Sequence, residues 1–374
     1  MLVSSDVSGV SRAGILTIET GAVQWLGAEG VEEHPGRFSD SGDWLFTVQN
    51  VDATLKPVLY QTKSGDARTL KLPAGLAQVL AFVENDAKLI INLTASNRRA
   101  ELILYDLASD TYEILLPADY GSIDPSLFVE ARHIRYPSAD GSMVPAILWL
   151  PHDIQPGDKL PALLYIHGGP TSQWFQAFDS FAQLLVSRGF AVLMPNPRDS
   201  TGYGVTGRDA CIKDWGGKDL DEVAAGAEYL AELDFIDKER MSIYGVSYGG
   251  YMTYIAATKR PELFEAAIAY VGITDQHKLY EEDMPHFQYY LRQQMGDPVS
   301  DHDLWRDRRW QTFSRDGCRG QKIRYRSPEA ILKHLWEVSE VRGRPQVLYC
   351  LSGMHGGFGR TGWYTGCHMA SCTA

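Results

Sequence analysis

A serine flanked by glycines is the first candidate for chemistry in this sequence. The pattern G-x-S-x-G occurs as GVSYG at residues 245–249, with Ser247 at its centre. It follows a predicted strand, 241–244, and opens a predicted helix, 251–260. A strand, a sharp turn and a helix in this order form a nucleophile elbow, whose turn leaves no room for side chains two residues before and two residues after the serine and therefore needs glycines there. We predict Ser247 as a nucleophile, with an ordinary glycine-rich turn as the alternative.

A serine that attacks a carbonyl group also needs N–H donors for the oxyanion that develops. In an elbow of this kind one donor is the backbone N–H of the next residue, here Tyr248, and another comes from a loop at the end of an earlier strand. The sequence HGGP at residues 167–170 follows a predicted strand, 160–166, where such a loop belongs. Its glycines let the backbone approach a substrate closely. In the alternative interpretation, His167 is only a capped histidine at a strand end.

The elements that must position these residues alternate between strands and helices from about residue 126. Residues 131–136 and 144–150 flank a turn and predict a β-hairpin. Apolar strands follow at 160–166, 191–194 and 241–244, with helical patterns at 178–188 and 220–233. Such alternation predicts a largely parallel sheet that is covered by helices on both faces. We assign this α/β domain to residues 123–307.

A different pattern repeats along residues 1–122. An apolar strand, a small-residue turn and a second strand recur, and the turn glycine Gly65 follows Gly21 by 44 residues. The four-stranded blades of a β-propeller take about 40–45 residues each. The segment therefore predicts a partial β-propeller of fewer than three blades, whereas a closed propeller has at least about four. A generic antiparallel meander is the alternative.

Four blocks of sequence carry a more specific signal. They are LYIHGGP at 164–170, NPRDSTGYG at 196–204, DWGGKD at 214–219 and GVSYGGYM at 245–252. Together and in this order they resemble the prolyl oligopeptidase family of serine peptidases, and within it the acylaminoacyl-peptidase-like branch. The resemblance implies an α/β-hydrolase domain preceded by a β-propeller, and hydrolysis of short peptides through an acyl-enzyme on Ser247. It also implies that the backbone N–H groups of Gly169 and Tyr248 form the oxyanion hole. Asp199 departs from the family, which usually has glycine there.

A catalytic triad would need an acid and a histidine besides Ser247, in that chain order. The resemblance implies the acid about 80 residues after the serine and the histidine about 30 residues further on. Neither a strand pattern nor an aspartate is evident near Ser327. His355, in the sequence GMHGGF, is our candidate general base, with His334 and His368 as poorer ones.

Residues 308–374 differ in composition from the rest of the chain. They hold 11 Lys and Arg against 4 Asp and Glu (net +7), whereas residues 1–307 hold 24 against 43 (net −19). They also hold four of the five cysteines, and the family resemblance stops near residue 307. We predict an atypical basic C-terminal segment, for which a native basic tail and a shifted reading frame are both open explanations.

This segment leaves two other functions open. Without its histidine, a triad serine keeps only the roughly 10³–10⁴-fold catalysis that the oxyanion hole and binding supply. A catalytically inactive fragment that lacks the Asp and His of the triad is therefore one alternative. A small-ester hydrolase with the same nucleophile is the other.

The composition limits the expected partners and cofactors. A net charge of −12 over 374 residues argues against nucleic-acid binding, which depends on clustered Lys and Arg. No apolar run reaches about 18 residues, so we expect no membrane span, and the N-terminus lacks a secretory signal, which predicts a cytoplasmic protein. The cysteines show no C-x-x-C or zinc spacing, so we expect no metal and no cofactor. A small peptide is the expected partner, and the oligomeric state stays open.

Overall fold

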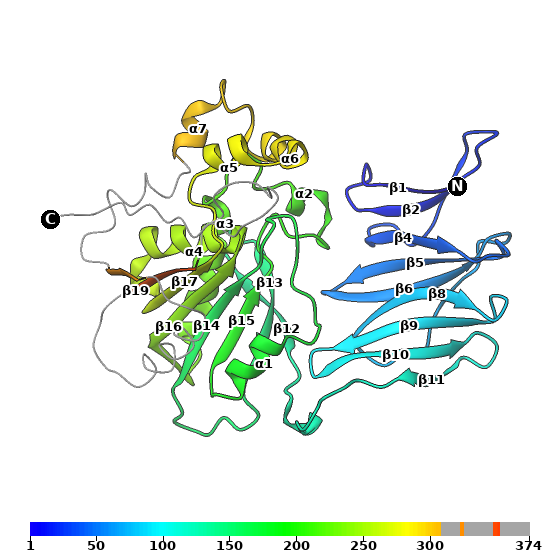
Figure 1. Ribbon diagram of the computed structural model, residues 1–374, viewed down its shortest axis with the longest axis horizontal. Helices are drawn as coiled ribbons and strands as arrows, with labels where there is room; N and C mark the ends of the chain where they lie inside the picture. Colours follow the sequence, from blue (N-terminus) through cyan, green and yellow to red (C-terminus); the bar gives the residue numbers. More distant parts are fainter. Residues whose placement is uncertain (308–321, 325–346, 352–374) are drawn as a thin grey trace, which may run out of the picture.

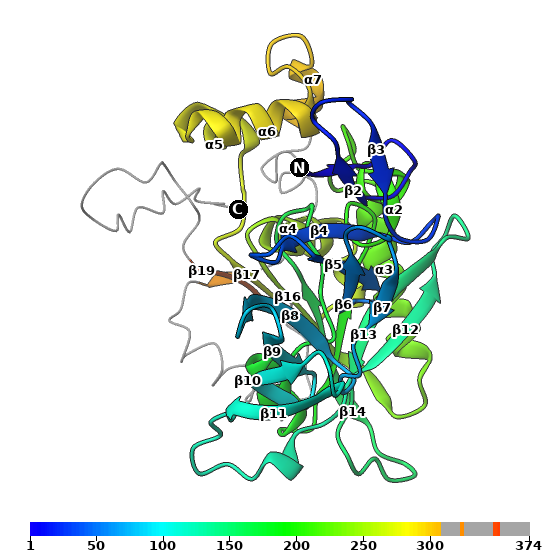
Figure 2. The same ribbon diagram turned by 90° about the vertical axis from the view of Figure 1, so that its right-hand side faces the viewer.

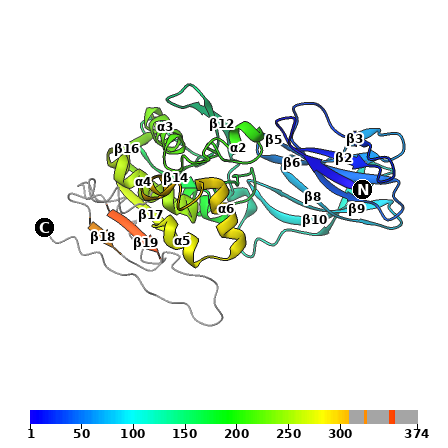
Figure 3. The same ribbon diagram turned by 90° about the horizontal axis from the view of Figure 1, so that it is seen from above.

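The computed structural model describes residues 1–307, 322–324 and 347–351, and its strands form four sheets. Three antiparallel sheets lie next to one another at one end of the molecule, and an eight-stranded mixed sheet with its helices forms the other end (Figure 1). The view from above shows the same division (Figure 3). Within the described ranges, every helix is too short or too polar to cross a membrane.

The three antiparallel sheets are meanders, because each strand pairs with its neighbours in the chain. Alternation of apolar and polar residues explains their strands. In β9, for example, Leu89, Ile91 and Leu93 are fully buried while the residues between them are partly exposed, as the two-residue period of a strand requires. The sheets comprise β1 (Leu2–Ser5), β2 (Arg12–Leu16) and β3 (Val23–Trp25); β4 (Glu33–Phe38), β5 (Trp44–Val51), β6 (Thr54–Gln61) and β7 (Ala67–Thr69); and β8 (Leu76–Val83), β9 (Lys88–Ala95), β10 (Arg98–Asp106) and β11 (Thr111–Leu116).

The repeat in the sequence has a direct structural counterpart. The turns after β2, β6 and β10 each close with a backbone hydrogen bond from an N–H to the carbonyl oxygen four residues earlier. The donors are Gly21, Gly65 and Asp110, and all three have positive φ, which glycine adopts without strain. The same turn therefore recurs at the same place in each of the three sheets.

The mixed sheet has the strand order β12-β13-β15-β14-β16-β17-β19-β18. The predicted hairpin is confirmed, since β12 and β13 pair in antiparallel fashion. The six strands that follow in the sheet order, β15-β14-β16-β17-β19-β18, run parallel to one another. All five residues of β15 are buried, as expected for a strand covered on both faces. The strands are β12 (Arg132–Pro137), β13 (Met143–Trp149), β14 (Leu160–Ile166), β15 (Ala191–Pro195), β16 (Ile236–Val246), β17 (Ala266–Tyr270), β18 (Lys322–Arg324) and β19 (Val347–Leu351).

Helices cover both faces of this sheet. One core cluster contains the buried faces of α3 and α4 and the strand residues that point toward them, and another contains those of α1. A third group, α5 to α7, lies together above the sheet (Figures 1 and 2). The helices are η1 (Pro125–Leu127), α1 (Ser180–Val186), α2 (Gly204–Arg208), α3 (Lys218–Glu232), α4 (Tyr248–Lys259), η2 (Pro261–Leu263), α5 (Gln276–Glu282), α6 (Pro285–Met295) and α7 (His302–Asp307).

Two short strands extend the sheet beyond β17. The expectation that no strand lies near residue 327 was wrong, because β18 ends at Arg324. β19, with the sequence VLYCL, pairs in parallel with β17. Its apolar run was a signal that the unusual composition of the segment obscured.

Candidate active site

Ser247 occupies the tight turn between β16 and α4. Its φ of 58° and ψ of −115° are unusual for a residue with a side chain, and such strain is typical of a nucleophile elbow. A Cβ added to Gly245 would lie 2.1 Å from the carbonyl oxygen of Gly249. A Cβ added to Gly249 would lie 2.3 Å from the carbonyl oxygen of Ile166. Both glycines are therefore required by close backbone contacts, as the sequence predicts.

The glycine loop that follows β14 lies directly against this turn. A Cβ on Gly168 would come within 3.5 Å of the Cβ of Ser247, and the next residue, Gly169, is exposed with a φ of 128°. Tyr248 begins α4, where backbone N–H groups have no partner within the helix. The structure thus brings Ser247, Tyr248 and the glycine loop together, and the oxyanion role of Gly169 and Tyr248 stays a prediction.

His167 holds the glycine loop in place. Its Nδ1 lies 2.7 Å from the carbonyl oxygen of Gly168, which can only accept a hydrogen bond, so Nδ1 carries the proton. Burial lowers the pKa of His167 to about 4, so the ring is neutral and Nε2 accepts from the Ser200 hydroxyl at 3.0 Å. Both ring nitrogens are occupied, and His167 is therefore not available as the general base.

Residues of the DWGGKD block contact Tyr248, the residue that follows the nucleophile. The Tyr248 hydroxyl donates to the buried carboxylate of Asp219, which also accepts from the N–H groups of Gly216 at 3.0 Å and Leu220 at 2.8 Å. Trp215 packs edge-on against the Tyr248 ring, with 4.9 Å between the ring centroids. Burial raises the pKa of Asp219. These contacts fix the side chain of the residue that follows the nucleophile.

An arginine of the NPRDS block forms an ion pair and hydrogen bonds with α3. Arg198 donates its backbone N–H and its guanidinium to the carboxylate of Glu222, both at 2.6 Å, and reaches Asp140 at 2.7 Å. Glu222 is almost fully buried, so this ion pair is shielded from water. Hydrogen bonds from Ser142 and from Arg198 hold the pKa of Asp140 below its usual range. The loop between β15 and α2 is thereby anchored at its start.

The residues that would complete a triad lie outside the described part of the chain. His355, His334 and His368 all fall there. None of the histidines that the structure describes hydrogen bonds to Ser247. The described residues also include no group of three or more His, Cys, Asp or Glu side chains that could hold a metal ion.

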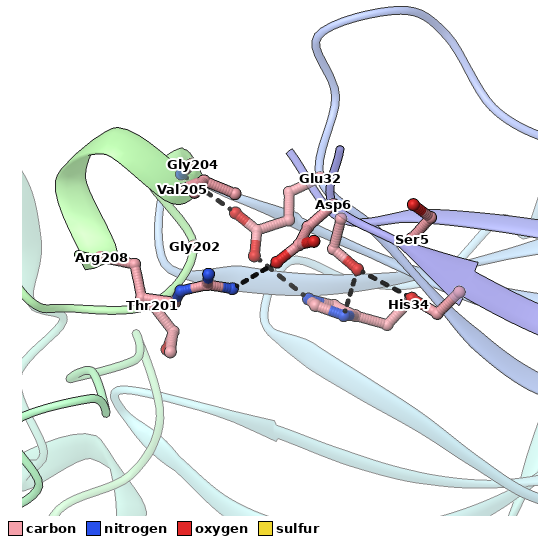
Figure 4. A pocket seen from close by; sticks show the side chains of 11 residues that line it. Ser5, Asp6, Glu32, His34, Thr201, Gly202, Gly204, Val205 and Arg208 are labelled. Carbon is pink, nitrogen blue, oxygen red and sulfur yellow. Dashed lines mark hydrogen bonds and ion pairs between the residues drawn. The ribbon is translucent and has the colours of Figure 1, made fainter. Parts of the chain in front are cut away.

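A cavity of about 380 Å³ lies between the antiparallel sheets and the loop that precedes α2 (Figure 4). Arg208 of α2 forms an ion pair with Asp6 at 2.8 Å, and the Gly204 N–H donates to Glu32 at 3.3 Å. Thr201 lines the cavity, and its N–H donates to the carbonyl oxygen of Ser172, just after the glycine loop. One lining residue of the cavity is therefore hydrogen-bonded to the residue that closely follows the glycine loop.

Sequence reasoning missed three residues of this site. Asp219, Ser200 and Arg208 find their partners 29, 33 and 202 positions away in the chain. The blocks that contain Asp219 and Ser200 were visible as motifs, but no spacing rule indicates which residues of separate loops meet. Arg208 carried no signal.

Residues 176–314 match the family model described as prolyl oligopeptidase family. Among curated proteins, an uncharacterized peptidase YuxL of Bacillus subtilis is 28% identical over 249 residues, which is 66% of this chain and 37% of that protein. Dipeptidyl peptidase 8 of Homo sapiens is 36% identical over 145 residues, 37% of this chain and 16% of that protein. This chain thus spans well under half the length of these relatives.

Solved structures share the fold of nearly the whole chain. A puromycin-hydrolyzing peptidase of Mycobacterium tuberculosis aligns with a TM-score of 0.79 at 21% identity, covering 95% of this chain and 57% of the other. The acylaminoacyl peptidase of Pyrococcus horikoshii aligns with a TM-score of 0.70 at 22% identity, covering 94% and 55%. These likenesses confirm the predicted fold class, an α/β-hydrolase domain preceded by a partial β-propeller.

Proposed function

Because this chain belongs to the prolyl oligopeptidase family, we propose that it is a serine peptidase that hydrolyses short peptides through an acyl-enzyme on Ser247. The observation that carries the proposal is the conformation of Ser247. A serine held at a φ of 58° between a parallel strand and a helix, with a glycine loop against it, is the arrangement that acyl transfer requires. A purely structural turn has no need of that strain.

The chemistry follows from this placement. The Ser247 hydroxyl oxygen attacks the peptide carbonyl carbon while its proton passes to a general base, and the N–H groups of Gly169 and Tyr248 donate to the oxyanion. The C–N bond breaks as the base returns the proton to the leaving amine. Water then attacks the ester in the same way, which releases the acid and restores Ser247.

His355 is the proposed general base. The last residue of β19, Leu351, pairs with Tyr270 of β17, and Tyr270 pairs with Val246, the residue before Ser247. Parallel strands end at the same edge of a sheet, so β19 leads toward the edge that carries the elbow. His355 follows only four positions after Leu351 in the sequence. This register favours His355 over His368, which lies further along.

Short peptides are the proposed substrate class. The cavity between the sheets and the loop before α2 is lined by Thr201, which is hydrogen-bonded to Ser172 after the glycine loop, and the size of the cavity suits a few residues of peptide. Among the similar structures, one is an acylaminoacyl peptidase in complex with Z-Gly-Gly-Phe-chloromethyl ketone, which supports the same class here.

The first test is covalent labelling by a fluorophosphonate probe, followed by intact-mass analysis. We expect one label per wild-type chain and none on Ser247→Ala. His355→Ala should label at least about 10³-fold more slowly, whereas His368→Ala, the matched control, should label normally. Labelling of Ser247→Ala at the wild-type rate would refute the assignment of the nucleophile. A folded wild-type chain that does not label would favour the inactive alternative.

Substrate class is tested on the same preparations. We expect Ser247-dependent hydrolysis of acyl-amino-acid amides and of blocked di- and tripeptide amides. Hydrolysis of chromogenic acyl esters without any amide hydrolysis would favour the small-ester hydrolase instead. Because both reactions use Ser247, the Ser247→Ala variant is the background for each.

A further inference from the structure

Asp199 combines three unfavourable features in the loop between β15 and α2. It is completely buried, and its φ of 76° lies in the left-handed region that side chains avoid. One carboxyl oxygen, Oδ1, accepts from the Cys211 N–H at 2.7 Å, while the other, Oδ2, is buried with no hydrogen-bond partner among the described residues. Native proteins seldom bury an unpaired polar atom, and strain of this kind persists mainly at functional sites.

The loop that holds Asp199 supports the glycine loop. The neighbouring Ser200 donates to His167, and Thr201 donates its N–H to the carbonyl oxygen of Ser172. These two hydrogen bonds connect residues 199–201 to the two ends of the segment 167–172. Any movement of Asp199 therefore reaches the loop that contains Gly169.

On its other side Asp199 faces the support of Tyr248. The Cys211 thiol lies next to both Asp199 and Asp219, and Asp219 accepts the Tyr248 hydroxyl. We call Asp199, Cys211, Asp219 and Tyr248 the acid cluster. All four side chains are buried, so the cluster joins the two predicted halves of the oxyanion hole through the interior.

The charges around the acid cluster are predominantly negative. Burial, with the nearby carboxylates of Asp219 and Asp209, raises the pKa of Asp199 to about 7. The other titratable groups near the cluster are Tyr290 of α6, Glu222 of α3, Tyr251 of α4 and Asp214, which lies just before α3. Among the described residues no cation pairs with Asp199 or Asp219, because Arg198 is already bound to Glu222 and Asp140.

We propose that Asp199 is a positioning residue whose protonated carboxyl group holds the two halves of the oxyanion hole in register. With the proton in place Asp199 adds no negative charge to the buried acid cluster. When the proton leaves to solvent, a negative charge without a cation appears in a dry space beside Asp219, and the loop between β15 and α2 opens. This inference rests on the proposed function, because it concerns the oxyanion hole of that reaction.

The sign of the pH effect follows from the two states of the loop. In the closed loop Asp199 binds its proton up to about pH 7, whereas in an open loop it ionises near its ordinary value of 3.8. The closed state therefore binds more protons between pH 4 and 7, and opening becomes easier as the pH rises through that range. Above pH 7 both states are ionised and the effect levels off.

Hydrogen exchange read by mass spectrometry on the full chain tests this without any turnover. The reporters are the N–H groups of Cys211, bound to Asp199, and Thr201, bound to Ser172. After correction for intrinsic exchange, their wild-type protection should fall at least tenfold from pH 5 to pH 7 and then level off. Asp199→Asn and Asp199→Gly should both remove this step, since neither titrates and glycine accepts the positive φ. Asp209→Asn, which removes a partly exposed neighbouring charge but not the titrating group, is the control and should keep the step at a slightly lower pH.

The outcomes separate the two proposals. If Asp199→Asn and Asp199→Gly keep the wild-type pH step, Asp199 is not the titrating group and the inference is wrong. If the wild-type protein shows the Asp199-dependent pH step at the Cys211 N–H but no step at the Thr201 N–H, the proposed link from Asp199 to the glycine loop is wrong. The rate of Ser247 labelling in wild type relative to Asp199→Asn should also decline as the pH rises from 5 to 7 and then level off. Absence of all labelling, with the exchange results as expected, would refute the proposed function and leave the proton-dependent loop intact.

Discussion

Replacing Gly249 by alanine tests whether the elbow is held by backbone contacts. The new Cβ would lie 2.3 Å from the carbonyl oxygen of Ile166 and 2.8 Å from that of His167. Ordinary contacts of this kind are more than about 1 Å longer than the first distance. Both partners are backbone atoms at the end of a buried strand, so neither can rotate away.

The expected cost can be worked from two opposing effects. Overpacking against a rigid core costs about 3 kcal/mol, and alanine regains up to about 1 kcal/mol over glycine in a helix. Gly249→Ala should therefore lower the free energy of unfolding by about 2 kcal/mol or more. It should also slow labelling of Ser247, because relief of the clash must move the chain that leads into the glycine loop.

Urea denaturation followed by circular dichroism measures this effect, with Gly207→Ala as the matched control. Gly207 also lies in a helix, α2, but its added Cβ would meet only Tyr203 at 3.8 Å, an ordinary contact. The control should be neutral or stabilised by up to about 1 kcal/mol. If Gly249→Ala unfolds at the wild-type urea concentration, the elbow is not restrained by these carbonyl groups and the reasoning fails.

Three further changes follow from single contacts. Asp179→Ala removes the N-cap of α1, whose carboxylate accepts the Ala182 N–H at 2.7 Å, and should cost about 1 kcal/mol in urea denaturation. Tyr248→Phe removes a buried hydrogen bond to a carboxylate and should cost about 1–3 kcal/mol, while the Ser247 labelling rate changes only a few-fold because the backbone N–H is kept. His167→Gln removes a group whose pKa falls from 6.5 to about 4 on folding. As the pH drops from 6.5 to 4, the free energy of unfolding of wild type should therefore decrease by up to about 3 kcal/mol relative to that of the variant. Urea midpoints of both proteins across this pH range measure the difference.

Features governed by neighbouring residues were predictable from the sequence. The turns at Gly21 and Gly65 and the glycines around Ser247 each reflect a local backbone requirement, and the structure shows it at each position. Strand and helix patterns likewise gave the α/β class, because burial on one or both faces leaves a period in the sequence.

Features that depend on long-range contacts were not predictable. Arg208 and Asp6 meet across 202 residues, and Ser200 meets His167 only because two loops converge at one edge of the sheet. The left-handed conformation of Asp199 gave no sequence signal, since aspartate is common in ordinary turns. The burial that makes Asp199 informative arises only when Cys211, Asp219 and Tyr290, from separate parts of the chain, come together near it.

His167 and Asp199 are titratable groups with opposite effects in one assembly, joined through Ser200. A histidine with a lowered pKa makes the fold less stable as the pH falls from 6.5 to 4. An aspartate with a raised pKa makes the fold more stable over the same change, by a similar amount of about 3 kcal/mol. The two contributions nearly cancel in wild type, so the effect of either group is clear only when the other is removed. Asp199→Asn should therefore become more sensitive to acid than wild type, and His167→Gln less sensitive. Parallel pH profiles in both variants would show that the two groups do not titrate as their burial requires.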